Sequence, residues 1–252
     1  MAPTSIDGTE ITGATIDGQD VSEITVDGET VFTAIPDSGV LRYRFEQNLI
    51  DDFGTNNGTD NTSAGYRTLS AEGSFAKSYD GVDDFITYPN LNVTSPSTSW
   101  TVAIFVILDS IPSSADAFIW HPRAEFDMNI SVDEGLSNDG LSTVRGQVVF
   151  QTFDGSTSTL KSGVTLTTGE YYLIGASNDG GGNYTVRVDS EKNTGALPSA
   201  NSTSSSNFVG GRVLDNGPQN LLDGGTDDFR IYDKELSDVE WDNLLTTGSI
   251  DG

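Results

Sequence analysis

The chain ends in a strand that leads directly into a capped helix. Residues 222–241 read LDGGTDDFRIYDKELSDVEW, in which Phe229 and Ile231 alternate with polar neighbours, the two-residue period of a half-buried strand. Ser237 stands at the N-cap position of a helix, and Glu240 completes a capping box. The apolar positions of that short helix are Val239, Trp241, Leu244 and Leu245. We predict that the final strand closes a sheet with strands formed much earlier in the chain.

Short alternating stretches separated by turn residues fill the middle of the sequence. The run Trp100–Leu108 is apolar at nearly every position, as expected of a strand covered on both faces. Residues 50–73 are polar and predict a long loop. Many strands at this spacing indicate an all-β fold of two antiparallel sheets. The predicted strands are at about 74–79, 83–88, 99–109, 116–121, 125–132, 144–153, 159–166, 170–177, 183–189 and 206–213.

Three motifs occur in a fixed order along the chain. The first is Phe45-Glu46 followed by Asn48-Leu49 and Asp51, the second runs from Tyr79 to Ile86, and the third runs from Asp227 to Ser237. Together, over about residues 38–247, they resemble the LamG-like family of concanavalin A-like lectins and glucanases. The resemblance implies a two-sheet antiparallel jelly-roll sandwich with a short C-terminal helix. It leaves the function open, because this fold hosts lectins, hydrolases and adhesive modules.

The charge balance of the chain is extreme. There are 38 acidic and 12 basic residues, for a net charge of -26, and only 4 of the basic residues are lysines. A surface rich in aspartate and poor in lysine stays hydrated where concentrated salt screens charges over about 3 Å. We therefore predict adaptation to high salt, with an ordinary acidic surface protein as the alternative. The same charge disfavours nucleic-acid binding, because no basic stripe is present to replace the counterions of phosphates.

Several kinds of site are excluded by composition. The chain has no cysteine, which removes disulfides, thiolate zinc sites and a cysteine nucleophile, and its single histidine, His121, removes sites with several histidines.

The first residues have neither the basic nor the apolar region of a signal peptide. No apolar run is long enough to span a membrane. Six Asn-x-Ser/Thr sequons, at Asn57, Asn61, Asn92, Asn129, Asn183 and Asn201, would accept glycans only in an exported chain.

A threefold repeat with a spacing of ten residues occupies the N-terminus. An apolar β-branched residue precedes each Asp-Gly pair, and another follows it, which predicts short strands turned at Asp-Gly. We predict that residues 1–35 form a docking or oligomerisation module and that residues 36–252 form the jelly-roll domain. The alternative is that the repeat adds strands to its own sandwich. The predicted oligomerisation residues are Ile6, Ile11, Ile16, Val21, Val26 and Val31.

One stretch resembles a catalytic strand. Glu125-Phe126-Asp127-Met128-Asn129 is similar to the Glu-x-Asp-x-Glu strand of laminarinase-like glycoside hydrolases, in which the last Glu donates the proton. Asn129 occupies that last position, and an amide cannot donate a proton to a glycosidic bond. No Gly-x-Ser-x-Gly motif surrounds a serine that His121 could activate. We therefore predict a protein without enzymatic activity.

Calcium is the cofactor that the family resemblance implies. It places a structural Ca²⁺ where the first and last strands meet, held by hard oxygen ligands. The matching positions are Glu46 and Asp228, with Asp80, Asp84 or backbone carbonyls as further ligands. The alternative is a solvated acidic face in a chain that is acidic throughout.

A sugar-binding site would need an exposed aromatic residue with polar neighbours. The candidates are Tyr66 in the long loop, Trp120 with His121 and Arg123, and Tyr184 beside a glycine-rich turn. For each aromatic residue the alternative is burial in the core, which is the usual fate of aromatic side chains in strands.

These features together predict a non-enzymatic protein on the surface of a virion of a halophilic archaeal virus. It would be a capsid decoration, a turret or a tail-fibre subunit, made in the host cytoplasm and released by lysis. Its partners would be copies of itself, other virion proteins and host surface glycans, without membrane insertion. The alternatives are a secreted carbohydrate-binding adhesin, which would be extracellular, and a laminarinase-like hydrolase. The position in the particle, the subunit count and the glycan are left open.

Overall fold

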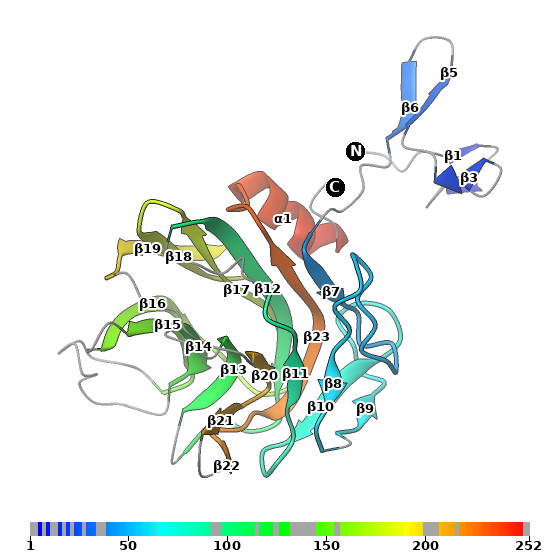
Figure 1. The fold of residues 1–252 in the computed structure, drawn as a ribbon. Helices are drawn as coiled ribbons and strands as arrows, with labels where there is room; N and C mark the ends of the chain where they lie inside the picture. The colour runs from blue at the N-terminus through cyan, green and yellow to red at the C-terminus, as the bar shows by residue number, and fades with distance from the viewer. Residues whose placement is uncertain are drawn as a thin grey trace.

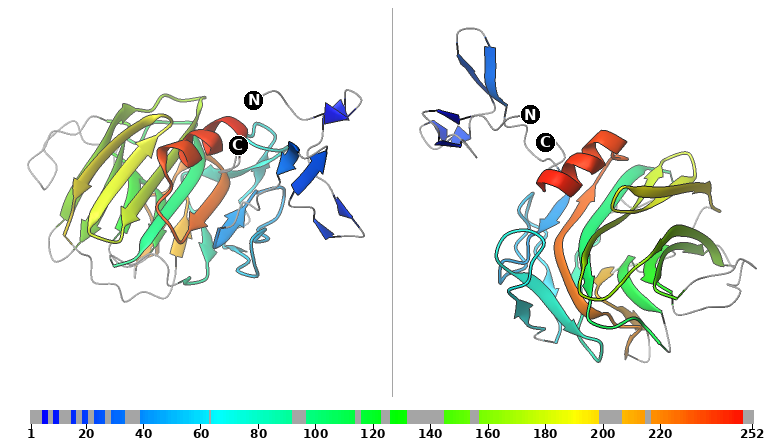
Figure 2. Two further views of the ribbon diagram at one scale, coloured as in Figure 1. Left: turned by 90° about the horizontal axis from the view of Figure 1, so that it is seen from above. Right: turned by 180° about the vertical axis from the view of Figure 1, so that it is seen from behind.

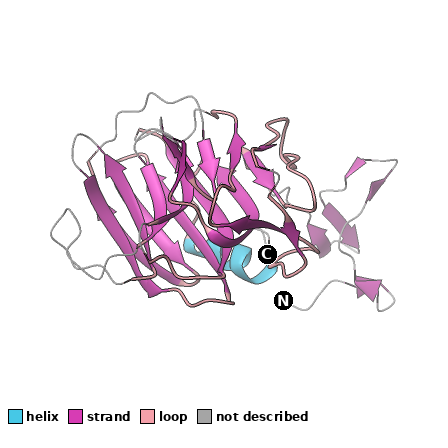
Figure 3. Ribbon diagram, turned by 90° about the horizontal axis from the view of Figure 1, so that it is seen from below, coloured by secondary structure: helices cyan, strands magenta, loops and turns pink. Residues whose placement is uncertain are grey.

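Nearly all regular structure in the described residues is strand, with one helix near the C-terminus (Figure 3). The computed structural model describes, with side chains, residues 39–62, 64–91, 97–113, 116–122, 126–131, 145–152, 157–198, 207–211 and 220–248. It describes as backbone only residue 153, residues 212–214 and 217–219, and six short strands between residues 5 and 33. Within this part of the chain, no helix has the length and apolarity that a bilayer crossing requires.

Eight strands form the first sheet. They are β7 (Leu41–Tyr43), β9 (Tyr66–Arg67), β10 (Ala76–Asp80), β12 (Ser99–Leu108), β17 (Tyr171–Asp179), β18 (Asn183–Val188), β19 (Glu191–Ala196) and β23 (Asp223–Tyr232). Their order is β19-β18-β17-β12-β23-β10-β9, and β7 pairs with β23 beyond the end of β10. All neighbours in this sheet are antiparallel.

Seven strands form the second sheet, which packs against the first (Figure 1). They are β8 (Thr59–Asp60), β11 (Ile86–Tyr88), β13 (Ala117–Pro122), β14 (Phe126–Ile130), β15 (Gln147–Phe153), β16 (Thr157–Thr165) and β20 (Asn207–Val209). Their order is β16-β15-β14-β13-β20-β11-β8. A separate antiparallel pair, β21 (Arg212–Leu214) and β22 (Gly217–Gln219), follows β20. The fold is the two-sheet antiparallel jelly roll that the sequence predicts.

The last long strand joins the two ends of the domain. One side of β23 pairs with β12, and the other pairs with β10 along its first half and with β7 along its second half. Figure 2 shows β23, in orange, between the green β12 and the blue to cyan strands. The register on β12 shifts beside Asp228, whose φ of 46° marks a β-bulge. The predicted closure between the first and last strands is confirmed.

Two apolar clusters hold the domain together. The main core lies between the sheets and contains one face of β12, from Val102 to Leu108. The other face of β12, with Ala103 and Phe105, packs with Trp241 and Leu244 of the helix α1 (Asp238–Thr247). Burial on both faces of this strand is confirmed. The capping box that the sequence predicts is also present, with Ser237 as N-cap and Glu240 at N3.

Close approach of the helix to the sheet depends on one glycine. Gly175 lies on β17 under the ring of Trp241, and a Cβ at this position would lie 2.5 Å from the ring and closer still to the carbonyl oxygen of Val102. Because the Val102 contact involves backbone, it cannot move aside as a side-chain end could. Trp241 is held in place by its indole N–H, which donates to the carbonyl oxygen of Asp189 at 2.6 Å.

We expect Gly175→Ala to lower the free energy of unfolding by about 1–3 kcal/mol, the usual cost of overpacking. The measurement is urea unfolding followed by tryptophan fluorescence. Gly65→Ala is the matched control, because a Cβ at residue 65 has nothing within 4 Å. Equal stabilities of the two variants would contradict this account of how α1 docks.

The N-terminal repeat forms three short hairpins. They are β1 (Ser5–Ile6) with β2 (Thr9–Glu10), β3 (Thr15–Ile16) with β4 (Gln19–Asp20), and β5 (Glu23–Val26) with β6 (Glu29–Thr33). In the sequence, one Asp-Gly pair stands between the two strands of each hairpin. Among the strands that the structure describes, these six pair only within their own hairpins. The domain boundary after residue 35 and the docking role stay predictions.

Candidate functional site

A groove of about 590 Å³ lies beside the β18–β19 hairpin and the start of α1, on the outer face of the eight-stranded sheet. Its volume lies in the range of small-molecule sites. We call it the hairpin groove. Its lining residues are Asp179, Asn183, Thr185, Arg187, Lys192, Thr194, Glu235, Leu236, Ser237 and Asp238.

The register of the hairpin aims polar side chains into this groove. Thr185 lies directly opposite Thr194, and Arg187 lies opposite Lys192. The alternate residues of β18, beginning with Tyr184, point into the main core. The hydroxyls of Thr185 and Thr194 are 2.9 Å apart and share one hydrogen bond, so the pair still has donor and acceptor capacity.

The wall formed by the start of α1 carries a carboxylate held by two cations. Asp238 accepts hydrogen bonds from Arg187 at 2.5 Å and from Lys192 at 2.7 and 2.5 Å. Arg187 is itself fixed by packing over the ring of Trp241, 5.4 Å from its centroid. The hydrogen bonds from Lys192, and then the one from Arg187, lower the pKa of Asp238 to about 2. Asp238 is therefore ionised at neutral pH.

The opposite wall, at the turn before β18, carries a second fixed carboxylate. Asp179 accepts from the side-chain amide of Asn183 at 2.6 Å and from the backbone N–H groups of Gly181 and Asn183 at 2.6 and 3.1 Å. These bonds, led by the one from the Asn183 side chain, lower the pKa of Asp179 below its usual range. An ionised carboxylate cannot act as a general acid, so Asp179 and Asp238 suit hydrogen bonding to hydroxyl groups better than proton donation.

The prediction that Trp120 and Tyr184 bind sugar is wrong. Trp120 and Tyr184 are fully buried in the main core, where no sugar can reach them. Tyr184 faces inward because of strand alternation. Trp120 faces inward because the pairing of β13 with β14 shifts between Phe118 and Trp120, which turns both Ile119 and Trp120 into the core.

Tyr66 and His121, two further predicted sugar-binding residues, do not line the groove. Tyr66 is half-buried, with the ammonium of Lys77 4.5 Å from its ring centroid. His121 is buried on the outer face of the seven-stranded sheet, where its ring stacks on Phe208 and its Nδ1 contacts Asp127. Arg123 lies outside the described residues.

The strand that resembles a hydrolase strand is β14. Glu125 lies outside the described residues, and Asp127 contacts His121. Asn129 is fully buried, and neither polar atom of its side chain has a hydrogen-bond partner among the described residues. Of the three positions that carry the resemblance, the described part therefore contributes one carboxylate and one amide.

The four predicted calcium ligands do not fit a single ion. The strand β7 ends at Tyr43 and Phe45 has a φ of 59°, so Glu46 lies in a loop, where it accepts from the backbone N–H of Ser74 at 2.7 Å. Asp228 is buried between Arg42 and Arg230, which occupy both of its oxygens. Two cations at that carboxylate leave it poorly suited to a third.

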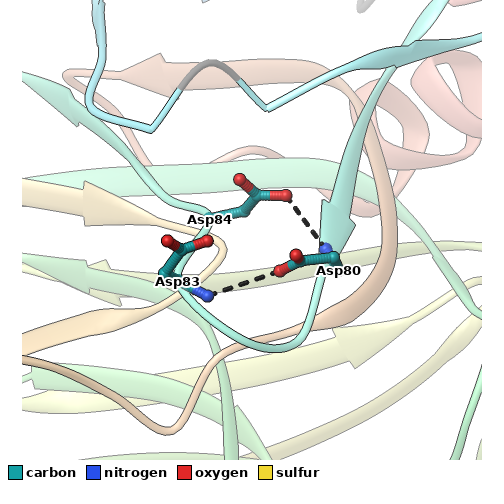
Figure 4. Close-up of side chains that lie close together, drawn as sticks. All are labelled: Asp80, Asp83 and Asp84. Atoms are coloured by element: carbon teal, nitrogen blue, oxygen red, sulfur yellow. Dashed lines mark hydrogen bonds between the residues drawn. The ribbon is translucent and has the colours of Figure 1, made fainter.

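The remaining two predicted ligands do come together. Asp80 and Asp84 lie with Asp83 around one turn (Figure 4), and their ligand oxygens are within 4.8 Å of one another. The carboxylate of Asp80 accepts from the backbone N–H of Asp83, and that of Asp84 accepts from the N–H of Asp80. The turn is thus held by its own hydrogen bonds, and calcium stays a prediction for Asp80 and Asp84.

Chelation tests that prediction. If Ca²⁺ links the three carboxylates, its removal leaves them to repel one another, and EDTA lowers the melting temperature of the purified protein. The Asp80→Asn variant should then show a smaller response to EDTA than the unaltered chain. A melting temperature that chelator leaves unchanged would speak against a structural calcium ion.

The predicted oligomerisation residues lie among those whose side chains are not described, or outside the described residues. Ile6, Ile16, Val26 and Val31 are on strands of the hairpins, and Ile11 and Val21 are outside the described residues. Their role stays a prediction.

The sequence analysis did not predict the hairpin groove, although it selected a residue whose two neighbours line the groove. It selected Tyr184 for its aromatic ring, whereas its neighbours Asn183 and Thr185 face the groove. The strand β19 supplies Lys192 and Thr194 and lacks the apolar alternation that identifies a strand. The available signal was the glycine-rich turn at 179–182 beside an alternating strand, which predicts a hairpin after β17.

Comparison with known proteins finds one family. The sequence profile of the concanavalin A-like lectin/glucanases superfamily matches residues 80–240. No curated protein matches the chain. At the identities given below, a likeness to solved structures shows the fold alone.

Three similar solved structures are a domain of an arabinanase and two domains that are described as binding domains. Domain 4 of AbnA, a GH43 extracellular arabinanase from Geobacillus stearothermophilus, solved with arabinotriose, has a TM-score of 0.64 and 17% identity over 83% of this chain and 98% of that one. The binding domain of Paraclostridial Mosquitocidal Protein 1 has a TM-score of 0.64 and 11% identity over 84% of this chain and 52% of that one. The receptor binding domain of botulinum neurotoxin D has a TM-score of 0.57 and 15% identity over 83% and 52%. This chain spans about half the length of the two toxin domains.

Proposed function

Because the chain belongs to the concanavalin A-like lectin/glucanase superfamily, we propose that it is a non-enzymatic glycan-binding module whose ligand lies in the hairpin groove. The observation that carries the proposal is the lining of that groove, where two threonine hydroxyls lie between two ionised carboxylates. Sugars offer many hydroxyl groups that donate and accept at once, and such a lining satisfies both roles.

The similar structures support a binding role. One of them is a domain of an arabinanase that was solved with arabinotriose, and others are receptor-binding domains of toxins. A module that attaches to a glycan is consistent with all of these descriptions. Their identities to this chain are low, so they support the shared fold, and the groove is what supports the choice of ligand.

Two features favour binding over hydrolysis. Asn129 stands where a hydrolase of this fold would need a proton-donating carboxyl, and the two walls of the groove carry carboxylates that stay ionised at neutral pH. Hydrolysis of a glycosidic bond needs a protonated carboxylic acid beside the leaving oxygen. A hydrolase remains the alternative that turnover of β-glucans would revive.

The setting that we propose is the surface of a virion in a salty environment. The hairpins of the N-terminal repeat would dock the chain to copies of itself or to other virion proteins, and the jelly roll would face the host glycans. The net charge of -26 supports a protein that works in concentrated salt. The alternative, a secreted adhesin of a halophile, uses the same groove and differs in how the chain reaches the outside.

A glycan array tests the binding role. The full chain is applied in concentrated salt beside the double variant Thr185→Val/Thr194→Val, which keeps side-chain shape and removes both hydroxyls. We expect binding of the unaltered chain to one group of oligosaccharides and loss of that binding in the double variant, with an unchanged melting temperature. Thr159→Val, on the other sheet, is the control. Failure of the unaltered chain to bind any glycan would refute the proposal.

Light scattering of the full chain in concentrated salt tests the docking role. We expect a closed oligomer for the unaltered chain and a monomer for Ile16→Asp/Val26→Asp, which places charges on the apolar positions of the repeat. A monomer in both cases would remove self-association and leave only docking to a different protein.

A further inference from the structure

The wall of the hairpin groove at the start of α1 has unused hydrogen-bonding capacity of both kinds. An ionised carboxylate has about four lone-pair positions and an ammonium has three donors. Asp238 accepts one bond from Arg187 and two from Lys192, so one position on its Oδ2 is left. Lys192 gives two donors to Asp238 and keeps one. Within the part of the chain that the structure describes, a free donor therefore lies beside a free acceptor.

Both groups can be reached by a ligand. The side chain of Asp238 is 59% exposed and that of Lys192 is 45% exposed. Arg187 on β18, in contrast, is buried against Trp241 and serves to hold Asp238 in place. A ligand would thus contact the carboxylate of Asp238, which Arg187 holds in position, and the exposed ammonium of Lys192.

Resting on the proposed function, we propose that the hairpin groove selects neutral glycans through a vicinal diol. One hydroxyl of the diol donates to Oδ2 of Asp238, and the adjacent hydroxyl accepts the remaining proton of the Lys192 ammonium. Two neighbouring oxygens on a sugar ring match a donor and an acceptor that already touch one another, so the diol fits without breaking the ion pair.

Anionic glycans fit this groove poorly. Both cations of the lining, Arg187 and Lys192, are already bonded to Asp238. A carboxylate or sulfate on the ligand can only accept hydrogen bonds, and it would face the acidic side chains of Asp179, Glu235 and Asp238. Within a chain of net charge -26, that repulsion disfavours uronic and sulfated sugars.

The charge state of the wall is stable. Because Lys192 and Arg187 hold the pKa of Asp238 near 2, this acceptor stays ionised well below neutral pH. Affinity for a neutral glycan should therefore vary little between about pH 5 and pH 8.

The test uses the full chain on an array of neutral, uronic and sulfated oligosaccharides, each neutral one present before and after periodate oxidation, which cleaves vicinal diols. We expect binding to neutral glycans only, and loss of binding after oxidation. Asp238→Asn should weaken the affinity by on the order of ten- to a hundredfold, the usual effect of losing a hydrogen bond to a charged group. Asp242→Asn, which changes the same charge on an exposed position of the same helix, should leave the affinity unchanged.

Lys192→Gln is a second variant that removes the donor from the exposed hairpin side, in case Asp238→Asn disturbs the start of α1. Preference of the unaltered chain for anionic glycans, or binding that survives periodate, would overturn the inference and leave the binding role intact. The inference would also be overturned, with the binding role intact, if Asp238→Asn bound glycans as the unaltered chain does while Thr185→Val/Thr194→Val lost binding. Binding to no glycan at all would overturn both proposals.

Discussion

Replacement of Arg230 by methionine is expected to lower the free energy of unfolding by about 3–5 kcal/mol, the usual cost of breaking a buried ion pair by removing one partner. Arg230 is completely buried on β23. It contacts the carboxylate of Asp228 through Nε at 2.9 Å and through Nη2, and Nη2 also donates to the carbonyl oxygen of Gly248 at the end of α1. Its loss leaves that carbonyl without this donor and leaves Arg42 as the one ion-pair partner of Asp228 among the described residues.

The measurement is equilibrium unfolding in urea at a fixed, high salt concentration. Arg44→Met is the matched control, because Arg44 pairs with Asp52 at the surface and such pairs contribute only about 0–1 kcal/mol. If the two variants lose the same stability, the buried cluster of Arg42, Asp228 and Arg230 does not join the first strand, the last strand and the helix as proposed.

Replacement of Asp227 by asparagine is expected to stabilise the domain at neutral and alkaline pH. Asp227 is fully buried on β23. Its Oδ2 accepts from the backbone N–H groups of Ala71 and Glu72 at 2.9 and 2.8 Å, while its Oδ1 is buried and has no hydrogen-bond partner in the described part of the chain. Burial is the main cause that raises the pKa of Asp227 to about 7, with the neighbouring charge of Asp228 adding to it. Ionisation of this group is therefore costly in the folded state.

How the stability changes with pH depends on the pH at which Asp227 loses its proton in the unfolded and in the folded chain. The unfolded chain loses the Asp227 proton near pH 3.8 and the folded chain keeps it until about pH 7. The stability that Asp227 contributes is thus complete below about pH 4 and is lost as the pH rises to about 7. The shift corresponds to roughly 4 kcal/mol at most.

Parallel pH series of the unaltered chain and Asp227→Asn check this prediction. Asparagine stays neutral, so the advantage of the variant should grow from pH 4 to pH 7 and then level off. Taking the difference between the two chains removes the contribution of the other acids. An advantage that does not change with pH would mean that Asp227 is ionised in the folded protein at all these pH values.

Local sequence patterns account for the fold because they are read along single strands. The alternation around Phe229 and Ile231, the capping box at Ser237 and the apolar run of β12 each depend on neighbours in sequence, and each appears in the structure. Such patterns do not predict features that depend on contacts between segments far apart in the sequence. Asp228 and Arg230 stand at the polar positions of the alternating pattern of β23. Both are nevertheless buried, and Arg230 donates a hydrogen bond to the end of α1.

The candidate site was harder to predict, for two physical reasons. A β-bulge changes which residues face the core, as at Trp120, and nothing in a strand's apolar pattern marks its position. An edge strand that packs few side chains, such as β19, carries no apolar pattern at all. The hairpin groove depends on both β19 and α1, which lie about 45 residues apart in the sequence.

The most direct test of the central claim is to map where a glycan binds. Backbone amide shifts of the full chain are followed by NMR while the neutral glycan with the highest affinity on the array is added in concentrated salt. We predict that the largest changes fall on Thr185, Lys192, Thr194 and Asp238. Changes confined to the other sheet, around Asp127 and Gln151, would contradict the assignment of the hairpin groove as the binding site.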